Sequence, residues 1–309
     1  MVMEEIIPKI ERSLFLNELT EKTFVRKTNF GKNLIYIVDH RNAPNVMLEL
    51  GRLREIAFRD AGGGTGKSTD IDSYDLGDNP FMQLLVWNPE DQEIVGGYRF
   101  IHCKFLERDE TGIVKTPTSK LFWYSENFIQ DYLPSTIELG RSFVQPDYQP
   151  TKNIRKGMYS LDNLWDGLGA LITLNEDAKY FFGKITMYNK ADLLAREAIL
   201  YFLEKFFPDP ENLVRPHKPV PNQTDPAFFG SLFSGVTYDD NYKILQQFVR
   251  KQNESIPPLV NAYMGLSSTM KTFGTSANES FGEVEETGIL ITIPDIFSKK
   301  RDRHLSENL

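Results

Sequence analysis

The sequence predicts an α/β (α+β) fold in which helices flank a mixed, mostly antiparallel sheet. Short runs of β-branched and aromatic residues alternate with longer segments whose apolar residues recur every three or four positions. The first strands are joined by a turn, whereas later strands are separated by helices, and this order favours a mixed sheet. The composition is that of a globular protein, with 40% hydrophobic and 25% charged residues.

The N-terminal half supplies most of the predicted strands. Residues 1–31 are polar and mixed, and we expect an N-terminal arm there. After the arm we expect a strand over 32–40, a helix over 45–61, an acidic loop over 70–78, a hairpin with strands at 81–87 and 93–103, and a short element at 121–124. Gly96 and Gly97 lie inside the second hairpin strand and indicate a bulge or the close approach of another backbone.

The C-terminal half alternates strands and helices. We expect strands over 136–144, 178–187 and 288–293, and helices over 159–174, 190–207, 242–252 and 257–266. Residues 208–240 are rich in Pro, Asn, Gly and Phe and predict an irregular insert. The whole organisation is therefore one domain over 32–295, followed by a basic polar tail over 296–309.

Charge and composition exclude several functions. The net charge of −8 argues against a nucleic-acid binder, and the single cysteine, Cys103, excludes a disulfide framework. The chain begins without a secretory signal and contains no apolar run of about 18 residues, so we expect a cytoplasmic protein, or one peripheral to the inner membrane. The cations of the tail suit either a solvated segment or contact with anionic lipid or an acidic carrier protein.

Several familiar motifs are present only in part. Residues 61–68 match a relaxed phosphate-loop pattern, but they follow a helix and precede an acidic loop, which is the reverse of the order that binds phosphate. We interpret them as a glycine linker. Asp70 and Asp72 form a weak candidate for a metal pair. No G-x-S-x-G motif occurs, and the four histidines lack ligand spacing, so we expect no serine hydrolase and no metal.

Five groups of polar and aromatic residues follow one another in a fixed order. They are Arg54 with Phe58, Asp72 with Asp75, Gly97 with Arg99, Glu138 with Arg141, and the loop Pro146–Tyr148. Each has a structural alternative, namely a surface residue, a turn cap, or an ion pair between Glu138 and Arg141. Arg99 is harder to explain in this way, because an arginine on an apolar strand needs an anionic partner.

This ordered set resembles the ornithine lipid and glycine lipid N-acyltransferase family, often labelled hemolysin-like, and more distantly the acyl-homoserine lactone synthases. Both groups have a GNAT-like fold. The patterns that carry the resemblance are Arg54-x3-Phe58, Asp72-x2-Asp75, Gly97-x-Arg99, Glu138-x2-Arg141 and Pro146-Asp-Tyr148. The stretches 180–187 and 256–266 favour the lipid N-acyltransferases. The resemblance extends from about residue 34 to 295.

The resemblance implies an N-acyltransferase of aminolipid biosynthesis. It would move a fatty acyl group, such as a 3-hydroxy fatty acyl chain, from the phosphopantetheine thioester of an acyl carrier protein (or from acyl-CoA) to the amine of a small amino acid such as glycine or ornithine. Acyl transfer to an amine needs a base, and we expect Glu138 to act as the base, directly or through water. No metal is required.

The acceptor and the acyl chain need further residues. Arg99 and Arg141 would bind the carboxylate of the acceptor, or else brace the acidic loop. Asp72 and Asp75 would orient these arginines or the ammonium group of the acceptor. We expect Arg54 and Phe58 to line the channel for the carrier and the acyl chain. These roles follow from residue type and order, as does that of Glu138.

The donor site is expected after the strand over 136–144. Backbone amides at Phe143 and Val144 would hold the thioester, next to the start of the helix at Asn163. The pyrophosphate loop of ordinary GNAT acetyltransferases is present only as the fragment Arg155-Lys-Gly157, which weakens the case for acetyl-CoA and favours a carrier protein. An acetyl-CoA-dependent N-acetyltransferase and a non-catalytic hemolysin-like binding protein remain the two alternatives.

Overall fold

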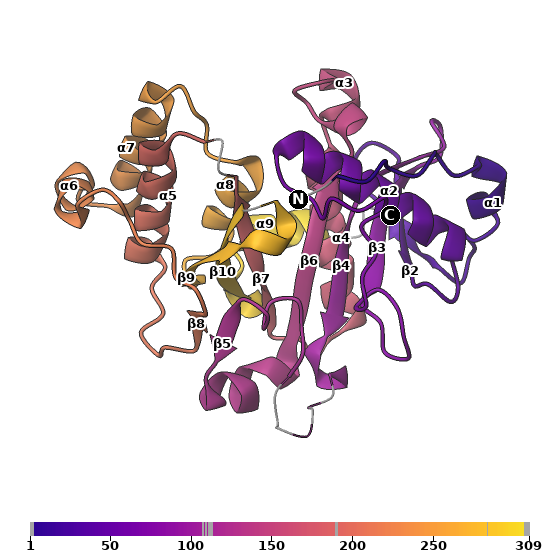
Figure 1. Cartoon of the computed structure of the whole chain (residues 1–309), viewed down its shortest axis with the longest axis horizontal. Coiled ribbons are helices and arrows are strands. Elements are labelled where there is room, and N and C mark those ends of the chain that lie inside the picture. Colours follow the sequence, from indigo (N-terminus) through magenta and orange to yellow (C-terminus); the bar gives the residue numbers. More distant parts are fainter. Residues whose placement is uncertain are drawn as a thin grey trace.

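A sheet of eight strands runs through the molecule in the order β1-β2-β3-β4-β6-β7-β10-β9 (Figure 1). The computed structural model describes residues 3–106, 108, 110, 114–188, 191–282 and 284–305. Neighbouring strands in this sheet are antiparallel except β6 and β7, which are parallel. The predicted mixed, mostly antiparallel sheet flanked by helices is therefore confirmed.

The chain forms one large sheet, a two-stranded ribbon and several helices. The strands of the large sheet are β1 (Phe24–Lys27), β2 (Leu34–Val38), β3 (Met82–Asn88), β4 (Glu93–His102), β6 (Thr136–Val144), β7 (Tyr180–Met187), β9 (Lys271–Asn278) and β10 (Val284–Thr292). A separate ribbon pairs β5 (Phe122–Tyr124) with β8 (Val214–Pro216). The helices are α1 (Arg12–Leu16), α2 (Pro44–Ala61), α3 (Ile154–Gly157), α4 (Ser160–Leu174), α5 (Leu193–Phe206), α6 (Pro226–Leu232), α7 (Tyr238–Lys251), α8 (Pro258–Met264) and α9 (Ser298–Leu305).

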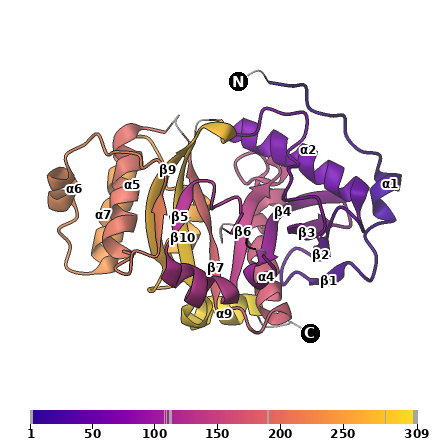
Figure 2. The same ribbon diagram turned by 60° about the horizontal axis from the view of Figure 1, so that its bottom comes forward.

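Helices cover the two faces of the sheet separately, with α2 on one side and α4 on the other (Figure 2). On the α2 face, Leu50 and Leu53 pack with Leu85. On the α4 face, Leu168 packs with Leu84, and α5 and α8 bury their apolar residues in the same cluster. A third apolar cluster surrounds β5 on the side opposite α4. The sheet therefore separates two distinct environments.

Each long predicted element is present. Helix α2 begins with Pro44 in its first turn and ends at Gly62, which adopts the left-handed conformation expected of a terminating glycine. The helices predicted from 3.6-residue periodicity correspond to α2, α4, α5, α7 and α8. Helix α7 begins earlier than predicted, at Tyr238, because Thr237 and Asp240 form a capping box.

Several short elements were not predicted because their sequences carry no clear periodic signal. The predicted arm contains α1 and also contributes β1, which pairs with β2 at the edge of the sheet. The insert over 208–240 contains β8 and α6. Strand β9 has few apolar residues, and the first half of β10 carries Glu285 and Glu286. Both strands are stabilised by pairing with each other rather than by a clear alternating pattern.

The predicted basic tail is helical where the structure describes it. Residues Ser298–Leu305 form α9, which lies along α4. The imidazole of His304 lies 2.8 Å from the carboxylate of Asp166, and Arg303 forms an ion pair with Asp162. The sequence of α9 shows no apolar periodicity, so it did not predict a helix that packs against α4. Residues 306–309 of the predicted tail lie outside the described residues.

Within the part of the chain that the structure describes, no helix is both long and apolar enough to cross a membrane. The domain boundaries at 32 and 295 stay a prediction.

Gly96 confirms the predicted close approach of another backbone. A Cβ at Gly96 would lie 2.3 Å from the carbonyl oxygen of Phe143 on β6, whereas a Cβ at Gly140 would meet no atom within 4 Å. We expect Gly96→Ala to lower the free energy of unfolding by about 1–3 kcal/mol. Gly140→Ala is the matched control and should change it little. Equal losses in urea unfolding of the two variants would contradict this packing.

Candidate active site

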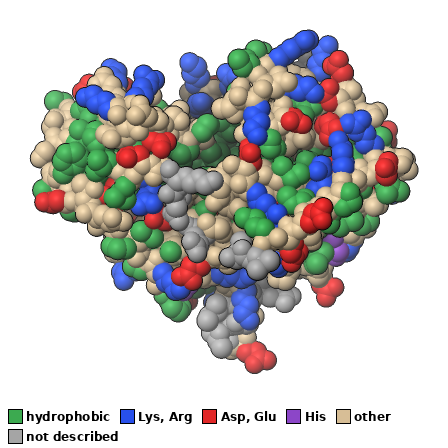
Figure 3. Space-filling view, turned by 45° about the horizontal axis from the view of Figure 1, so that its top comes forward, with side chains coloured by type: hydrophobic (Ala, Val, Ile, Leu, Met, Phe, Trp, Pro, Cys, Tyr) green, Lys and Arg blue, Asp and Glu red, His purple; other side chains and the backbone are tan. Residues whose placement is uncertain are grey.

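Strands β6 and β7 separate after a short parallel contact. The pairing covers only Thr136–Glu138 and Tyr180–Phe182. Beyond it, β6 continues along β4 and β7 continues along β10. The strands still approach each other at Gly183, where a Cβ would lie 2.8 Å from the carbonyl oxygen of Leu139. They then diverge (Figure 1), and the space-filling view of that end of the molecule shows a hollow with hydrophobic side chains in it (Figure 3).

A bulge in β6 lies beside this gap. The register between β4 and β6 shifts between Gly97 and Arg99, and Arg141 has a φ of 50°, which is unusual for a residue other than glycine. Leu139 packs in the cluster on the α4 face, whereas Phe143 packs in the cluster on the α2 face. Residues four apart on a regular strand would point to the same face, so the extra residue reverses the alternation. The bulge thus brings Arg141 to the α2 face.

Three arginines and three aspartates form an ion network between α2 and the sheet. Arg54, on α2, hydrogen bonds to Asp70 at 3.1 Å and to Asp75 at 3.2 Å. Its guanidinium also donates to the side-chain oxygen of Gln83 on β3 at 3.1 Å. Arg54 is only 1% exposed and lies behind Arg141 and Asp72, and its role in lining a channel stays a prediction.

The network extends across the sheet to the gap. Arg99, on β4, binds Asp72 at 2.8 Å and Asp75 at 3.2 Å. Arg141, on β6, binds Asp70 at 2.8 Å and lies 3.7 Å from Asp72. The predicted anionic partner of Arg99 is therefore the acidic loop. Of the two roles that the sequence left open for the arginines, bracing this loop is the one that the contacts describe.

The side chains at the open edge of this network are Arg141 and Asp72. Their side chains are 18% and 28% exposed, whereas Arg99 and Asp75 are almost completely buried. The guanidinium of Arg141 also stacks over the ring of Phe281, 4.4 Å from its centroid. Arg141 is thus the arginine of the network that a ligand in the gap can reach.

The charges of the network stabilise one another. Burial alone would raise the pKa of Asp75, but the guanidiniums of Arg54 and Arg99 outweigh it and hold that pKa well below its ordinary value. The pKa of Asp70 is lowered in the same way, with Arg141 making the largest contribution of the arginines. All three aspartates are therefore balanced by three arginines, which is what allows charges to be buried here.

Glu138 lies on the same face, at the last residue where β6 pairs with β7. It is 1% exposed, and its Oε1 accepts a hydrogen bond from the amide of Thr118 at 3.2 Å. Its Oε2 has no hydrogen-bond partner within the described part of the chain. Burial raises the pKa of Glu138, and the ammonium of Lys184 opposes this only in part. A carboxylate with a free oxygen and a raised pKa is suited to accept a proton.

Glu138 and Arg141 do not form the ion pair that was the structural alternative for them. Arg141 is bound to aspartates of the acidic loop. The cation near Glu138 is Lys184, whose ammonium donates to the hydroxyl of Thr118 at 3.2 Å and lies 3.8 Å from the carboxylate of Glu286. The two residues of the motif thus belong to adjacent clusters on one face.

Three hydroxyl groups lie near the gap on the opposite face. Tyr98, on β4, is buried among the residues that α4 covers, and Ser142 and Tyr263 lie beside its hydroxyl. That hydroxyl has no hydrogen bond of normal geometry in the described structure. Tyr263 comes from α8 and packs against Trp165 of α4, with ring centroids 5.5 Å apart. The hydroxyls of Tyr98, Ser142 and Tyr263 thus form one small polar group on an otherwise apolar face.

The donor-site residues predicted from the sequence are spread over different positions. Phe143 is buried in the α2-face cluster, and Phe58 packs near it, with ring centroids 6.5 Å apart. The Val144 carbonyl accepts a hydrogen bond from Gln149 at 2.9 Å. Arg155 is exposed on α3. These residues border the end of β6 and the connection that leads to α4.

Gly157 and Asn163 have structural explanations. A Cβ at Gly157 would lie 2.4 Å from the backbone nitrogen of Pro150, so a glycine is required there. The side chain of Asn163 is fully buried, accepts from Asn33 at 2.7 Å and donates to the carbonyl of Phe30 at 2.8 Å. Asn163 therefore ties the β1–β2 turn to α4, and its side chain does not point to a ligand.

Sequence reasoning missed several participants of the site. Asp70 was considered only for a metal pair, although its spacing from Asp72 and Asp75 places it in the same loop. Thr118 and Lys184 gave no signal, because their contact with Glu138 depends on the sheet pairing.

The glycine-rich segment over 61–68 has no free phosphate cradle. The carboxylate of Glu55 accepts hydrogen bonds from the amides of Thr65 and Gly66, at 3.1 and 2.8 Å. Arg59 donates to the carbonyl of Lys67. A glutamate of α2 thus takes the place that an anion would need, in agreement with the interpretation as a linker.

Known proteins similar to this chain are acyltransferases. An acetyltransferase (GNAT) domain family matches residues 53–157. Glycine N(alpha)-acyltransferase of Bacteroides thetaiotaomicron is 54% identical over 303 residues, which cover 98% of this chain and 90% of the relative. Glycine N(alpha)-acyltransferase of Phocaeicola vulgatus is 52% identical, over 98% of this chain and 93% of the relative.

This chain belongs to the GNAT-like N-acyltransferase family. The N-acyltransferase resemblance predicted from the ordered motifs is confirmed, and the non-catalytic alternative is set aside. Among solved structures, a CoA-dependent acyl-homoserine lactone synthase aligns with a TM-score of 0.29 and 14% identity, over 54% of this chain and 72% of that chain. The assignment of this N-acyltransferase rests on the sequence relatives alone.

The ion network predicts how the N-acyltransferase responds to acid. The pKa of Asp75 is lowered in the folded state, so Asp75 contributes stability above its unfolded value of about 4, and this stability is lost as the pH falls below that value. Asp75→Asn removes the buried countercharge that Arg54 and Arg99 share and should lower the free energy of unfolding at pH 7 by about 3–5 kcal/mol.

The control is Asp78→Asn, which changes an exposed aspartate of the same loop. Urea unfolding at pH 7 and at pH 3 measures both effects. The wild type should lose more stability than Asp75→Asn between these two pH values. If Asp78→Asn is as destabilising as Asp75→Asn, the buried network does not stabilise the fold in the way described.

Proposed function

We propose that this N-acyltransferase transfers a fatty acyl group, of the 3-hydroxy class, from an acyl carrier protein thioester to the amine of glycine. The observation that carries the proposal is the placement of Glu138. It has a free carboxylate oxygen and a raised pKa at the point where β6 and β7 part, in a chain 54% identical to a glycine N(alpha)-acyltransferase. The reaction would supply an acylated amino acid to aminolipid biosynthesis.

The acceptor nitrogen must lose two protons to become an amide, one to solvent as the ammonium becomes a free amine and one as the amide forms. The amine nitrogen attacks the thioester carbonyl, the new C–N bond forms, and the C–S bond breaks as the thiolate leaves. Glu138 takes the proton that the amine must lose, directly or through a water molecule, and the thiolate takes up a proton from the surroundings. Because burial raises the pKa of Glu138, its carboxylate is a stronger base than an exposed glutamate.

The acceptor would approach from the α2 face. Glu138 and Arg141 both lie on that face, and Arg141 is the partly exposed arginine of the network. A guanidinium matches a carboxylate in geometry, so we assign Arg141 to the carboxylate of glycine and Asp72 to its ammonium group before deprotonation. Arg54, Arg99, Asp70 and Asp75 would position these two groups from behind.

The donor would approach from the α4 face, through the gap between the strands. The backbone edge of β6 at Phe143 and Val144 would hold the thioester, because β7 has left this edge free. Tyr98, whose hydroxyl lies beside Ser142 and Tyr263, would contact a polar group near the thioester, such as a 3-hydroxyl. Together these features support a long, polar-headed donor in preference to acetyl-CoA.

A carrier protein is supported by the surface next to the gap. Arg155 and Ile154 of α3 are exposed, and Met158 follows them at 58% exposure. Cations mixed with apolar side chains suit an acidic carrier protein. The cations of α9 equally suit the anionic surface of a membrane, on which we propose that the enzyme works as a peripheral protein.

Thiol release tests the proposal directly. Purified enzyme is incubated with glycine or ornithine and with a 3-hydroxyacyl carrier protein, the corresponding acyl-CoA or acetyl-CoA, and free thiol is followed with a colorimetric reagent. We expect the highest rate with glycine and the carrier protein thioester. A higher rate with acetyl-CoA would support the N-acetyltransferase alternative, and no release with any pair would exclude the proposed function.

The assignment of Glu138 as the base predicts the effect of one substitution. Glu138→Gln should lower kcat by about 10²-fold or more while leaving the fold intact, and the wild-type rate should fall as the pH drops through the raised pKa of Glu138. Glu285→Gln is the matched control, because Glu285 is also buried with a raised pKa but faces α5 and Arg196. Near-normal turnover of Glu138→Gln would refute its role.

The proposed acceptor site predicts the effect of a second substitution. Arg141→Gln should raise KM for glycine at least tenfold and change KM for the thioester donor little, because the acceptor is the one substrate whose carboxylate Arg141 would bind. Steady-state kinetics with each substrate varied in turn measures this. The control is Arg52→Gln, which removes a partly buried arginine of α2 paired with Glu49. If Arg141→Gln raises KM for the donor alone, the assignment of Arg141 is reversed.

A further inference from the structure

A lysine and a glutamate face each other beside the proposed base. Lys184 lies on β7 and Glu286 on β10, and the ammonium of Lys184 is 3.8 Å from a carboxylate oxygen of Glu286. The same ammonium donates a hydrogen bond to the hydroxyl of Thr118 at 3.2 Å, and the amide of Thr118 donates to Glu138. Lys184 is thus a cation close to two carboxylates, those of Glu286 and Glu138.

The strand pairing places these groups on one face of the sheet. Glu138 pairs with Phe182, so Lys184, two residues further along β7, points to the same face as Glu138. Thr186, two residues further again, pairs with Glu286 on β10 and shares this face. Lys184 and Glu286 therefore lie beyond Glu138 in the direction in which β6 and β7 diverge.

The carboxylate of Glu286 depends on Lys184 for its countercharge. It accepts hydrogen bonds from the neutral side chains of Asn278, at 3.2 Å, and Thr186, at 3.5 Å. The side chain of Glu286 is only 6% exposed, and a carboxylate so deeply buried needs a cation nearby. Within the described part of the chain, Lys184 is the cation that lies within 4 Å of it, and the Lys184 side chain is itself 12% exposed.

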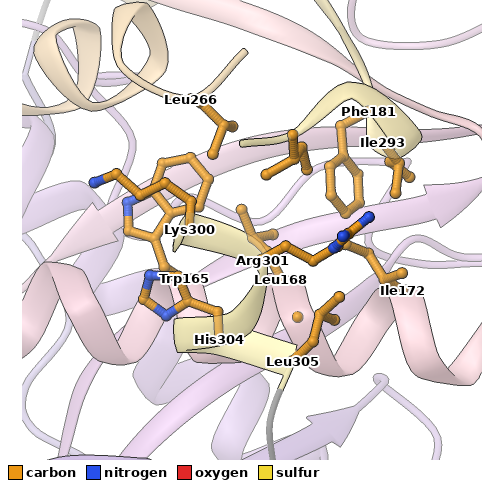
Figure 4. Close-up of a pocket in the computed structure, with 12 residues that line it drawn as sticks. Trp165, Leu168, Ile172, Phe181, Leu266, Ile293, Lys300, Arg301, His304 and Leu305 are labelled. Atoms are coloured by element: carbon orange, nitrogen blue, oxygen red, sulfur yellow. The ribbon is translucent and has the colours of Figure 1, made fainter. Parts of the chain in front are cut away.

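The apolar pocket between α4 and α9 lies on the opposite face of the sheet. Figure 4 shows Trp165, Leu168 and Phe181 around it. Its volume of about 30 Å³ has room for about two water molecules. Phe181 packs in the cluster on the α4 face, whereas Phe182, which pairs with Glu138, packs on the other face. An acceptor at Glu138 therefore does not reach this pocket, and its side chain stays on the α2 face.

The ammonium of Lys184 lies where the side chain of a diamino acid would place its own. In the proposed function, the amine that is acylated lies at Glu138. Ornithine carries a second ammonium at the end of a three-carbon side chain, and Glu286 is a carboxylate that such a group could bind from there. Lys184 already neutralises that carboxylate, so an incoming side-chain ammonium would meet a like charge in an occupied place.

We propose that Lys184 determines the class of acceptor, selecting monoamino acids such as glycine against diamino acids such as ornithine. Its ammonium fills the place beside Glu286 that the side-chain ammonium of a diamino acid would need, and excludes that group by volume and by like charge. The inference rests on the proposed function, since it takes the acceptor amine to lie at Glu138.

The test compares glycine, ornithine and norvaline as acceptors with one thioester donor. Norvaline has the three-carbon side chain of ornithine without the ammonium. Lys184→Ala removes the cation and frees Glu286, and it should raise the ratio of kcat/KM for ornithine to kcat/KM for glycine by about tenfold or more. The same ratio for norvaline should rise less. A ratio taken at one pH cancels any effect of Lys184 on the base, because Glu138 acts on every acceptor.

Three matched variants separate charge from space. Lys184→Met removes the charge but keeps most of the volume, so its gain for ornithine should be smaller than that of Lys184→Ala. Lys184→Ala combined with Glu286→Gln should lose the gain, because the carboxylate that binds the second ammonium is gone. The control is Lys271→Ala, which removes a partly buried lysine of β9 paired with Glu211 at 2.9 Å and should leave the ratio unchanged.

A thermal measurement tests the inference without turnover. Ornithine should raise the unfolding temperature of Lys184→Ala in a saturable way, and should not raise that of Lys184→Ala with Glu286→Gln. An unchanged ratio in Lys184→Ala, an equal gain in Lys271→Ala, or a wild type that uses ornithine as well as glycine would overturn the inference and leave acyl transfer to an amino acid intact. No thiol release with any acceptor would instead exclude the proposed function, and the absence of stabilisation by ornithine would then overturn the inference as well.

Discussion

The ion network of Arg54, Arg99 and Arg141 with Asp70, Asp72 and Asp75 is the constraint on which the site depends. It connects α2, β4, β6 and the acidic loop on one face of the sheet. Buried charges are stable only when they are paired, so each aspartate fixes the position of at least one arginine. The bulge of β6 turns Arg141 to this face, and Asp70 then holds it at the edge of the gap. The loop, the bulge and the open strand edge are therefore parts of a single arrangement.

The two faces of the sheet differ in chemistry. The α2 face carries the charged groups, with Glu138 and Arg141 three positions apart in sequence but in separate clusters. The α4 face carries apolar side chains and the hydroxyls near Tyr98. An amine acceptor and a long thioester donor have opposite requirements, and the gap between β6 and β7 is where these two environments meet. In the proposed function both substrates would reach the gap at once, and transfer would then be direct, without a covalent acyl-enzyme.

The sequence predicted the sheet, its long helices and the family, because these depend on strong periodicity and on ordered motifs. It did not predict β9 or α9, whose residues are polar and are held by strand pairing and by contacts such as His304 with Asp166. Arg54 and Asn163 were expected near substrates, and the structure shows both buried and hydrogen bonded to other side chains, so their roles toward substrates stay predictions. Residue type cannot distinguish a brace from a binding group, since both use the same hydrogen bonds. The partners Asp70, Thr118 and Lys184 became visible only when the fold brought distant segments together.

The central claim is that the buried network positions Arg141 for the acceptor. A double-mutant cycle between Asp70→Asn and Arg141→Gln, measured on kcat/KM for glycine, tests it most directly. If Asp70 acts by holding Arg141, each single variant should lower kcat/KM and the double variant should be little worse than Arg141→Gln alone, with a coupling energy above about 1 kcal/mol. Strictly additive losses, or a full rate in Asp70→Asn, would contradict the account.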